Sequence, residues 1–146
     1  MLVKVSLKKM LDYGALIDKA TYNNLLSLML DGGKYVNVSS EILQELQKRK
    51  EIQKEEQRKL KKTAMLNNKG IEYEKQGKIK RAILCYETNI SIGYPAHHSY
   101  KRLMVLYRKA KDYVNEERVI LRALDIFNDF PEYTERLIKL HKIMGK

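Results

Sequence analysis

The side chains best suited to chemistry are one cysteine, Cys85, and two adjacent histidines, His97 and His98. Neighbouring residues on a helix point about 100° apart, so two adjacent imidazoles do not readily hold one metal ion, and no Asp, Glu or Cys stands at a supporting spacing. No residue organises His97 or His141 toward Cys85 for nucleophilic catalysis. We therefore expect no metal site, a packing role for Cys85, and histidines that begin a helix or lie on the surface.

Catalytic and phosphate-binding motifs are missing from the sequence. The Gly32-Gly33-Lys34 segment is too short to cradle a phosphate, and there is no zinc-ligand spacing and no nucleophile elbow around a serine. The sequence therefore predicts neither an enzyme nor a cofactor.

The balance of charges indicates which partners suit the chain. Its 146 residues include 29 Lys and Arg against 18 Asp and Glu, a formal net charge of +11. Such a protein attracts acidic proteins, nucleic acid or anionic lipid, and it is not a nucleic-acid mimic, which would be acidic. A single cysteine excludes an intrachain disulfide and favours a cytoplasmic protein. Neither a membrane span nor a signal peptide is expected, because no run of 18 apolar residues occurs and Lys4, Lys8 and Lys9 interrupt the N-terminus.

Residues 1–38 are predicted to form an N-terminal helical segment. Apolar residues recur at helical spacing between Leu7 and Leu11 and between Leu25 and Leu30. Gly32-Gly33 follows the second run, and glycine tolerates the positive φ that often ends a helix. Val3 and Val5 alternate with polar residues, as does the stretch from Gly33 to Val38, so a pair of short strands is an alternative within this segment.

Residues 39–62 are predicted to form a long basic linker helix. The stretch from Lys48 to Lys62 contains eight basic and three acidic residues and only one large apolar residue before Leu60, Ile52. Three hypotheses fit: a solvated spacer, a strip that contacts nucleic acid or acidic protein, and self-association along Leu46, Ile52 and Leu60, whose spacing makes a poor heptad seam. The candidate anion contacts are Lys48, Arg49, Lys50, Lys54, Arg58, Lys59, Lys61 and Lys62.

The most specific pattern in the chain begins at Thr63. Gly70 allows a neighbouring helix to approach closely, Gly77 accommodates a tight turn, and Ala82 is small where two helices cross. The types of these residues and the spacing between them together resemble the tetratricopeptide repeat, a pair of antiparallel helices. The residues that carry the resemblance are Leu66, Gly70, Tyr73, Gly77, Ala82 and Tyr86.

A shift by the period of this family, about 34 residues, yields a second, degenerate repeat. We call this offset the repeat period. Large residues recur at it, but three departures stand out: Met104 corresponds to Gly70, Lys111 to Gly77 and Glu116 to Ala82. Pro95 precedes the second unit, and Pro131 begins one further amphipathic helix. The resulting prediction is an all-α fold with two tetratricopeptide-like repeats over residues 63–128, a capping helix over 129–146, and N-terminal helices that pack back against the long helix.

The resemblance implies a function in binding. In this family the first helix of each pair lines an inner groove, and here the second such strip is basic, which favours a protein or an acidic peptide as partner. The groove residues implied in this way are Asn67, Ile71, Glu74, Lys101, Arg102, Val105 and Arg108. We therefore expect a protein interaction adaptor. The alternative is a basic nucleic-acid-binding or regulatory protein that uses the 48–62 helix, and the short, Lys-rich chain also looks like products of mobile elements.

Overall fold

The computed structural model describes residues 1–146 and divides them into two compact units, Met1–Gln57 and Arg58–Lys146. We call them unit 1 and unit 2. Helices dominate both units, so the predicted all-α class is confirmed, with one small antiparallel sheet in addition. No helix combines the length and the apolar character that crossing a membrane requires.

Unit 1 contains a two-stranded sheet and short helices. Its elements in order are β1 (Leu2–Ser6), α1 (Leu7–Leu11), the 3-10 helix η1 (Gly14–Leu16), α2 (Lys19–Leu30), β2 (Tyr35–Ser39) and the beginning of α3 (Ser40–Lys75). The strands pair Val3 with Val38 and Val5 with Val36, so the alternating valines share one face. The strand pair that alternation allowed is therefore present, and its valines pack in a core that includes Leu46 of α3.

Local sequence explains how the helices of unit 1 begin and end. Ser6 accepts a hydrogen bond from the backbone of Lys9 at the start of α1, and Asp18 does the same for Thr21 at the start of α2. The α2 helix ends before Gly32, whose φ of 92° favours glycine.

The α3 helix runs without a break from Ser40 to Lys75. It therefore contains both the segment predicted as a linker helix and the segment predicted as the first repeat helix. Residues 51–62 are all exposed, as a solvated helix with few apolar residues requires.

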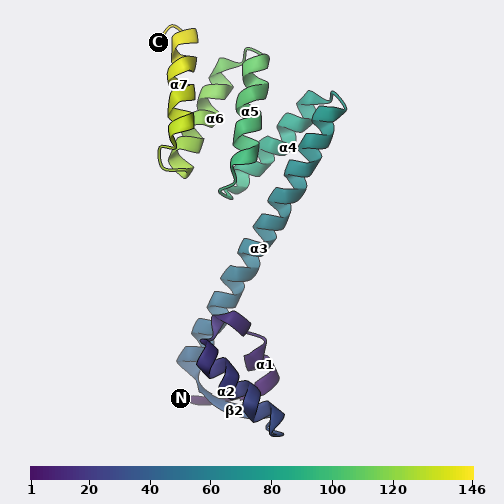
Figure 1. Cartoon of the computed structure of the whole chain (residues 1–146), viewed down its shortest axis with the longest axis vertical. Coiled ribbons are helices and arrows are strands. Elements are labelled where there is room, and N and C mark those ends of the chain that lie inside the picture. The colour runs from purple at the N-terminus through teal and green to yellow at the C-terminus, as the bar shows by residue number, and fades with distance from the viewer. The chain divides into compact units, whose positions relative to one another are not determined.

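Unit 2 consists of antiparallel helices with a regular period. After α3 come α4 (Ile79–Ile92), α5 (His97–Lys109), α6 (Tyr113–Ile126) and α7 (Pro131–Ile143). Both ends of α6 follow those of α4 by one repeat period, and both ends of α7 follow those of α5 by the same offset. The period seen in the sequence is thus the period of the helix boundaries, and α4 to α7 stand side by side in Figure 1.

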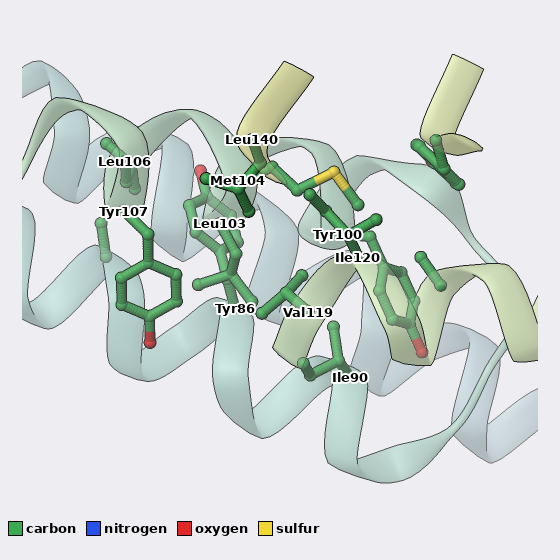
Figure 2. Close-up of a cluster of buried hydrophobic side chains, with 13 residues drawn as sticks. Tyr86, Ile90, Tyr100, Leu103, Met104, Leu106, Tyr107, Val119, Ile120 and Leu140 are labelled. Carbon is green, nitrogen blue, oxygen red and sulfur yellow. The ribbon is translucent and has the colours of Figure 1, made fainter. Parts of the chain in front are cut away.

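One core joins these helices. Figure 2 shows Tyr86 and Ile90 of α4 beside Leu103 and Met104 of α5 and Val119 and Ile120 of α6. A Cβ atom built on Gly70 would meet the ring of Tyr86 at under 3.0 Å. Gly70 is therefore required for the close approach of α4 to α3, as its place in the sequence pattern predicts.

The two hairpin turns differ in the residue that adopts a positive φ. Gly77 between α3 and α4 has a φ of 74°, and Lys111 occupies the equivalent position between α5 and α6 with a φ of 57°. The second turn therefore keeps the left-handed conformation although its side chain disfavours it.

The two units differ strongly in charge. Unit 1 contains nine Lys and Arg and eight Asp and Glu, a net charge of +1. Unit 2 contains 20 Lys and Arg and ten Asp and Glu, a net charge of +10. Any attraction of the protein for polyanions therefore belongs mainly to unit 2.

Candidate functional site

Helices α5 and α7 enclose a groove of about 320 Å³. Met104 and Tyr133 are each 1% exposed, so they form an apolar floor. The walls carry four cations and two carboxylates, a mixture suited to a polar peptide. The lining residues are Lys101, Met104, Val105 and Arg108 of α5, and Glu132, Tyr133, Glu135, Arg136 and Lys139 of α7.

A buried carboxylate fixes two of the groove's cations. Arg108 donates through Nε to both oxygens of Glu116, at 2.7 and 3.0 Å, and Arg136 donates through Nε to Oε1 of the same carboxylate at 3.1 Å. Glu116 is fully buried, and the Nη2 atom of Arg108 is buried without a partner. One carboxylate thus binds two guanidinium groups but neutralises only one of their two charges, which leaves an excess positive charge at this end of the groove.

This contact also explains why position 116 holds a glutamate where position 82, one repeat period earlier, holds an alanine. Ala82 of α4 is fully buried at that position, and Glu116 takes the equivalent place in α6. A buried charge requires hydrogen-bonded partners, and α5 and α7 each supply one arginine. The prediction that Arg108 binds a ligand is therefore modified, because its guanidinium is already held by Glu116.

An exposed ion pair spans the groove nearer its other end. Lys101 Nζ of α5 lies 3.3 Å from Glu132 Oε2 of α7, and both side chains are about half exposed. A ligand carboxylate can compete for Lys101, since such exposed pairs contribute little to stability. Among the groove residues predicted on α5, Lys101, Val105 and Arg108 line this site.

Glu74 and Arg102, also predicted for the groove, bind each other instead. Arg102 donates through Nε to Glu74 at 3.0 Å and also through Nη2, and the Tyr86 hydroxyl donates to Glu74 at 2.6 Å. The hydrogen bond from Arg102 lowers the pKa of Glu74, and the one from Tyr86 lowers it further. Burial and the Glu74 carboxylate raise the pKa of Tyr86. These contacts link α3, α4 and α5 and leave no free charge for a partner.

The lowered pKa of Glu74 predicts a dependence of stability on pH. A carboxyl group with a lowered folded-state pKa contributes stability above its ordinary value of 4.5 and loses it as the pH falls through the folded value. We expect Glu74→Gln to destabilise unit 2 at about pH 6.5, and this difference to shrink at about pH 3. Urea unfolding of both proteins at the two pH values measures it. Glu72→Gln, an exposed change on the same helix, should show no such convergence, and a constant deficit in Glu74→Gln would contradict the assignment.

Asn67 takes part in a polar cluster inside unit 2. Asn89 of α4, itself buried, donates through Nδ2 to Asn67 at 2.9 Å, to Ser99 at 2.8 Å and to the carbonyl of Thr63 at 3.2 Å. Asn67 therefore joins α3 to α4 and α5. Ile71, one turn along α3, is half-buried and outside the α5–α7 groove.

The histidines have packing roles. His97 begins α5, as predicted, and is half-buried: its ring stacks on Phe127 at 3.8 Å and its Nδ1 lies 2.6 Å from the Tyr133 hydroxyl. His98 meets the Tyr86 ring edge-on at 5.7 Å. Burial lowers the pKa of His98, and the nearby Arg102 lowers it further. No three His, Cys, Asp or Glu side chains come together as a metal site.

The basic residues predicted on the linker helix do not form one free strip. Arg49 pairs with Glu45 at 3.1 Å, and the ammonium of Lys50 lies 5.2 Å from the ring centre of Tyr13. Arg58 is also engaged with a neighbour. Those that are exposed without a partner are Lys48, Lys54, Lys59, Lys61 and Lys62.

Sequence reasoning missed the α7 wall of the groove, because it assigns this helix only a capping role. A signal for most of the wall is present in the sequence. Glu135, Arg136 and Lys139 follow the predicted groove residues Lys101, Arg102 and Val105 by one repeat period. Applying the period once more to the predicted groove positions therefore gives three of the four charged wall residues of α7.

Comparison with protein-family models, with curated proteins and with solved structures yields no match to this chain.

Proposed function

We propose that unit 2 is a tetratricopeptide-like interaction module that holds a segment of another protein in the α5–α7 groove. The observation that carries the proposal is the groove itself, which has an apolar floor and charged walls. Its walls belong to α5 and α7, two helices whose bounds are related by the repeat period. A repeat of this kind supplies a surface for recognition, and its chemistry lies in the residues along that surface.

The charges of the groove indicate what such a segment contains. Four cations line it against Glu132 and Glu135, and buried Glu116 compensates only one of the two arginines. An acidic side chain is therefore favoured near Arg108 and Arg136, where charge-assisted hydrogen bonds are strong. A neighbouring apolar side chain fits the floor beside Val105. The partner expected is an acidic segment with at least one apolar anchor.

A pair of substitutions in the groove tests the proposal. Val105→Glu with Lys139→Glu places two carboxylates where the acidic segment would lie, and it leaves Glu116, Arg108 and Arg136 themselves unchanged. We expect binding of a partner captured from nuclease-treated lysate, and of an acidic peptide derived from it, to weaken about tenfold or more. Isothermal titration calorimetry with that peptide measures the effect. Arg108→Glu is unsuitable, because it adds a carboxylate beside buried Glu116 and unfolding would mimic loss of binding.

The matched control is Val114→Glu with Lys69→Glu. It changes the same residue types by the same charge at exposed positions outside the groove. Equal weakening in both variants would mean that overall charge, rather than the groove, governs binding. Unchanged affinity in the groove variant would reject the groove as the binding site.

A further inference from the structure

Most of the net positive charge of unit 2 lies in three short segments, 75–81, 109–112 and 142–146. Together these segments contain eight Lys and Arg and one acidic residue, Asp112, so their side chains carry +7 of the chain's +11. We call this surface the basic edge. Its cations, all on exposed residues, are Lys75, Lys78, Lys80, Arg81, Lys109, Lys111, Lys142 and Lys146.

The three segments lie at the same end of unit 2. The first is the turn from α3 to α4, the second is the turn from α5 to α6, and the third is the end of α7. Lys146 reaches back to Glu117 near the start of α6, at 2.8 Å, which ties the end of α7 to the second turn. Figure 1 shows the two turns and the C-terminus along one edge of the helical row. Adjacent packed helices are about 8–10 Å apart, so the cations form one continuous surface.

The start of α4 carries positively charged side chains where acidic or capping side chains would stabilise the helix. Lys78 is its N-cap residue, with φ −87° and ψ 68°, and its side chain caps nothing. Asp112, one repeat period later, has φ −88° and ψ 71° at the start of α6, and its carboxylate accepts a hydrogen bond from the backbone of Asn115 at 3.3 Å. Lys80 and Arg81 add two cations to the first turn of α4, where the helix dipole favours anions.

The turn between α5 and α6 also has a lysine at a position where another residue type would be locally more stable. Lys111 adopts the left-handed conformation that Gly77 supplies in the first turn. Glycine would take this conformation without the steric cost that a lysine meets. Two positions on one edge thus hold a lysine where a neutral or acidic residue suits the backbone better. Departures from local consistency concentrate at functional surfaces.

We propose that the basic edge binds the phosphate backbone of a double-stranded nucleic acid. Lysine ammonium groups are compact charges suited to phosphates. The three segments contain no aromatic residue, and the bordering rings of Tyr73 and Tyr113 are half-buried, Tyr73 lying 6.0 Å from the guanidinium of Arg81, so the edge offers no open ring on which the bases of a single strand could stack. The linker helix has as many cations between Lys48 and Lys62 but also three carboxylates. None of the edge cations lines the α5–α7 groove, so this proposal does not depend on the proposed peptide binding.

A variant that lacks four cations of the basic edge tests the proposal. It combines Lys78→Gln, Lys80→Gln, Arg81→Gln and Lys111→Gln. Affinity for a fluorescent mixed-sequence duplex of about 20 base pairs is measured by anisotropy between about 50 and 200 mM salt. We expect the wild-type affinity to fall steeply with salt. In the variant, affinity at the lowest salt should fall about tenfold or more, and the slope of log K against log salt should become shallower by about 3 to 4.

The matched control removes four linker cations: Lys48→Gln, Lys54→Gln, Lys59→Gln and Lys61→Gln. It has the same net charge as the edge variant, and we expect its affinity to change less than about twofold. Equal or greater weakening in the control overturns the proposal, as does no duplex binding by the wild type at low salt. Tighter binding to an acidic polypeptide or to anionic lipid vesicles than to the duplex overturns it as well.

A single substitution separates binding from folding. Lys78→Asp should reproduce the cap that Asp112 provides in the second repeat, and we expect it to raise Tm by about 4 °C. The same change removes a cation and adds an anion on the edge, so duplex binding should weaken although the protein is more stable. A stabilised Lys78→Asp protein with wild-type affinity for the duplex overturns the proposal.

Discussion

Replacing Glu116 with alanine is expected to destabilise unit 2 by about 3–5 kcal/mol. The carboxylate is fully buried and holds Arg108 of α5 and Arg136 of α7, so its removal leaves two facing guanidinium groups without compensation. The small side chain also leaves a cavity at the helix crossing. Urea unfolding followed by circular dichroism measures the loss. Glu135→Ala, an exposed change on α7, should cost less than about 0.5 kcal/mol.

A triple substitution identifies the cause of that loss. Replacing Glu116, Arg108 and Arg136 together with leucine removes all three charges and fills much of the space. We expect this variant to recover most of the lost stability, because a buried ion pair is worth little more than apolar residues of similar size. If Glu116→Ala costs less than about 1 kcal/mol, the carboxylate does not hold the two arginines in solution.

Gly70→Ala is the second change with a large expected effect, a loss of about 3 kcal/mol. At an exposed position within a helix the same substitution stabilises by about 1 kcal/mol, because alanine has the higher helix propensity. At Gly70 the new methyl group would overlap the ring of Tyr86, which is fully buried and cannot rotate away. Thermal and urea unfolding of unit 2 in the full chain measure the change.

The Tyr86 ring provides the control for Gly70. In a Tyr86→Ala background the space beside α3 is open, so adding Gly70→Ala should be neutral or stabilising. The sign of the effect therefore reverses between the two backgrounds. A similar loss in both backgrounds would show that the backbone of α3, rather than contact with Tyr86, requires the glycine.

The period of the helices in unit 2 was predictable from the sequence because it depends on small residues and turns. Gly77 ends one helix with a positive φ, and Gly70 lies under Tyr86, as its position in the pattern predicts. Such steric requirements act over a few residues or one helix crossing, so residue type and spacing reveal them. The strand pair of unit 1 was harder to predict, because Val3 and Val38 pair although they are far apart in the sequence.

The candidate site was predictable only in part. Lys101, Val105 and Arg108 line the groove between α5 and α7, whereas Glu74, Arg102 and Asn67 bind partners inside unit 2. Spacing assigns a residue to a helix face, but a long charged side chain can reach either a ligand or a neighbouring helix from that face. Only the placement of carboxylates on other helices decides between these outcomes.

The sequence by itself determined the helical class, the repeat period and the excess of positive charge, because each follows from residue type or spacing along the chain. The tertiary structure decided which charges remain free. It places Glu116 between Arg108 and Arg136, and it gathers cations from segments as far apart as Lys78 and Lys142 along one edge. Both outcomes depend on how helices distant in sequence pack together, and electrostatic energy depends on distances in space rather than on separation along the chain.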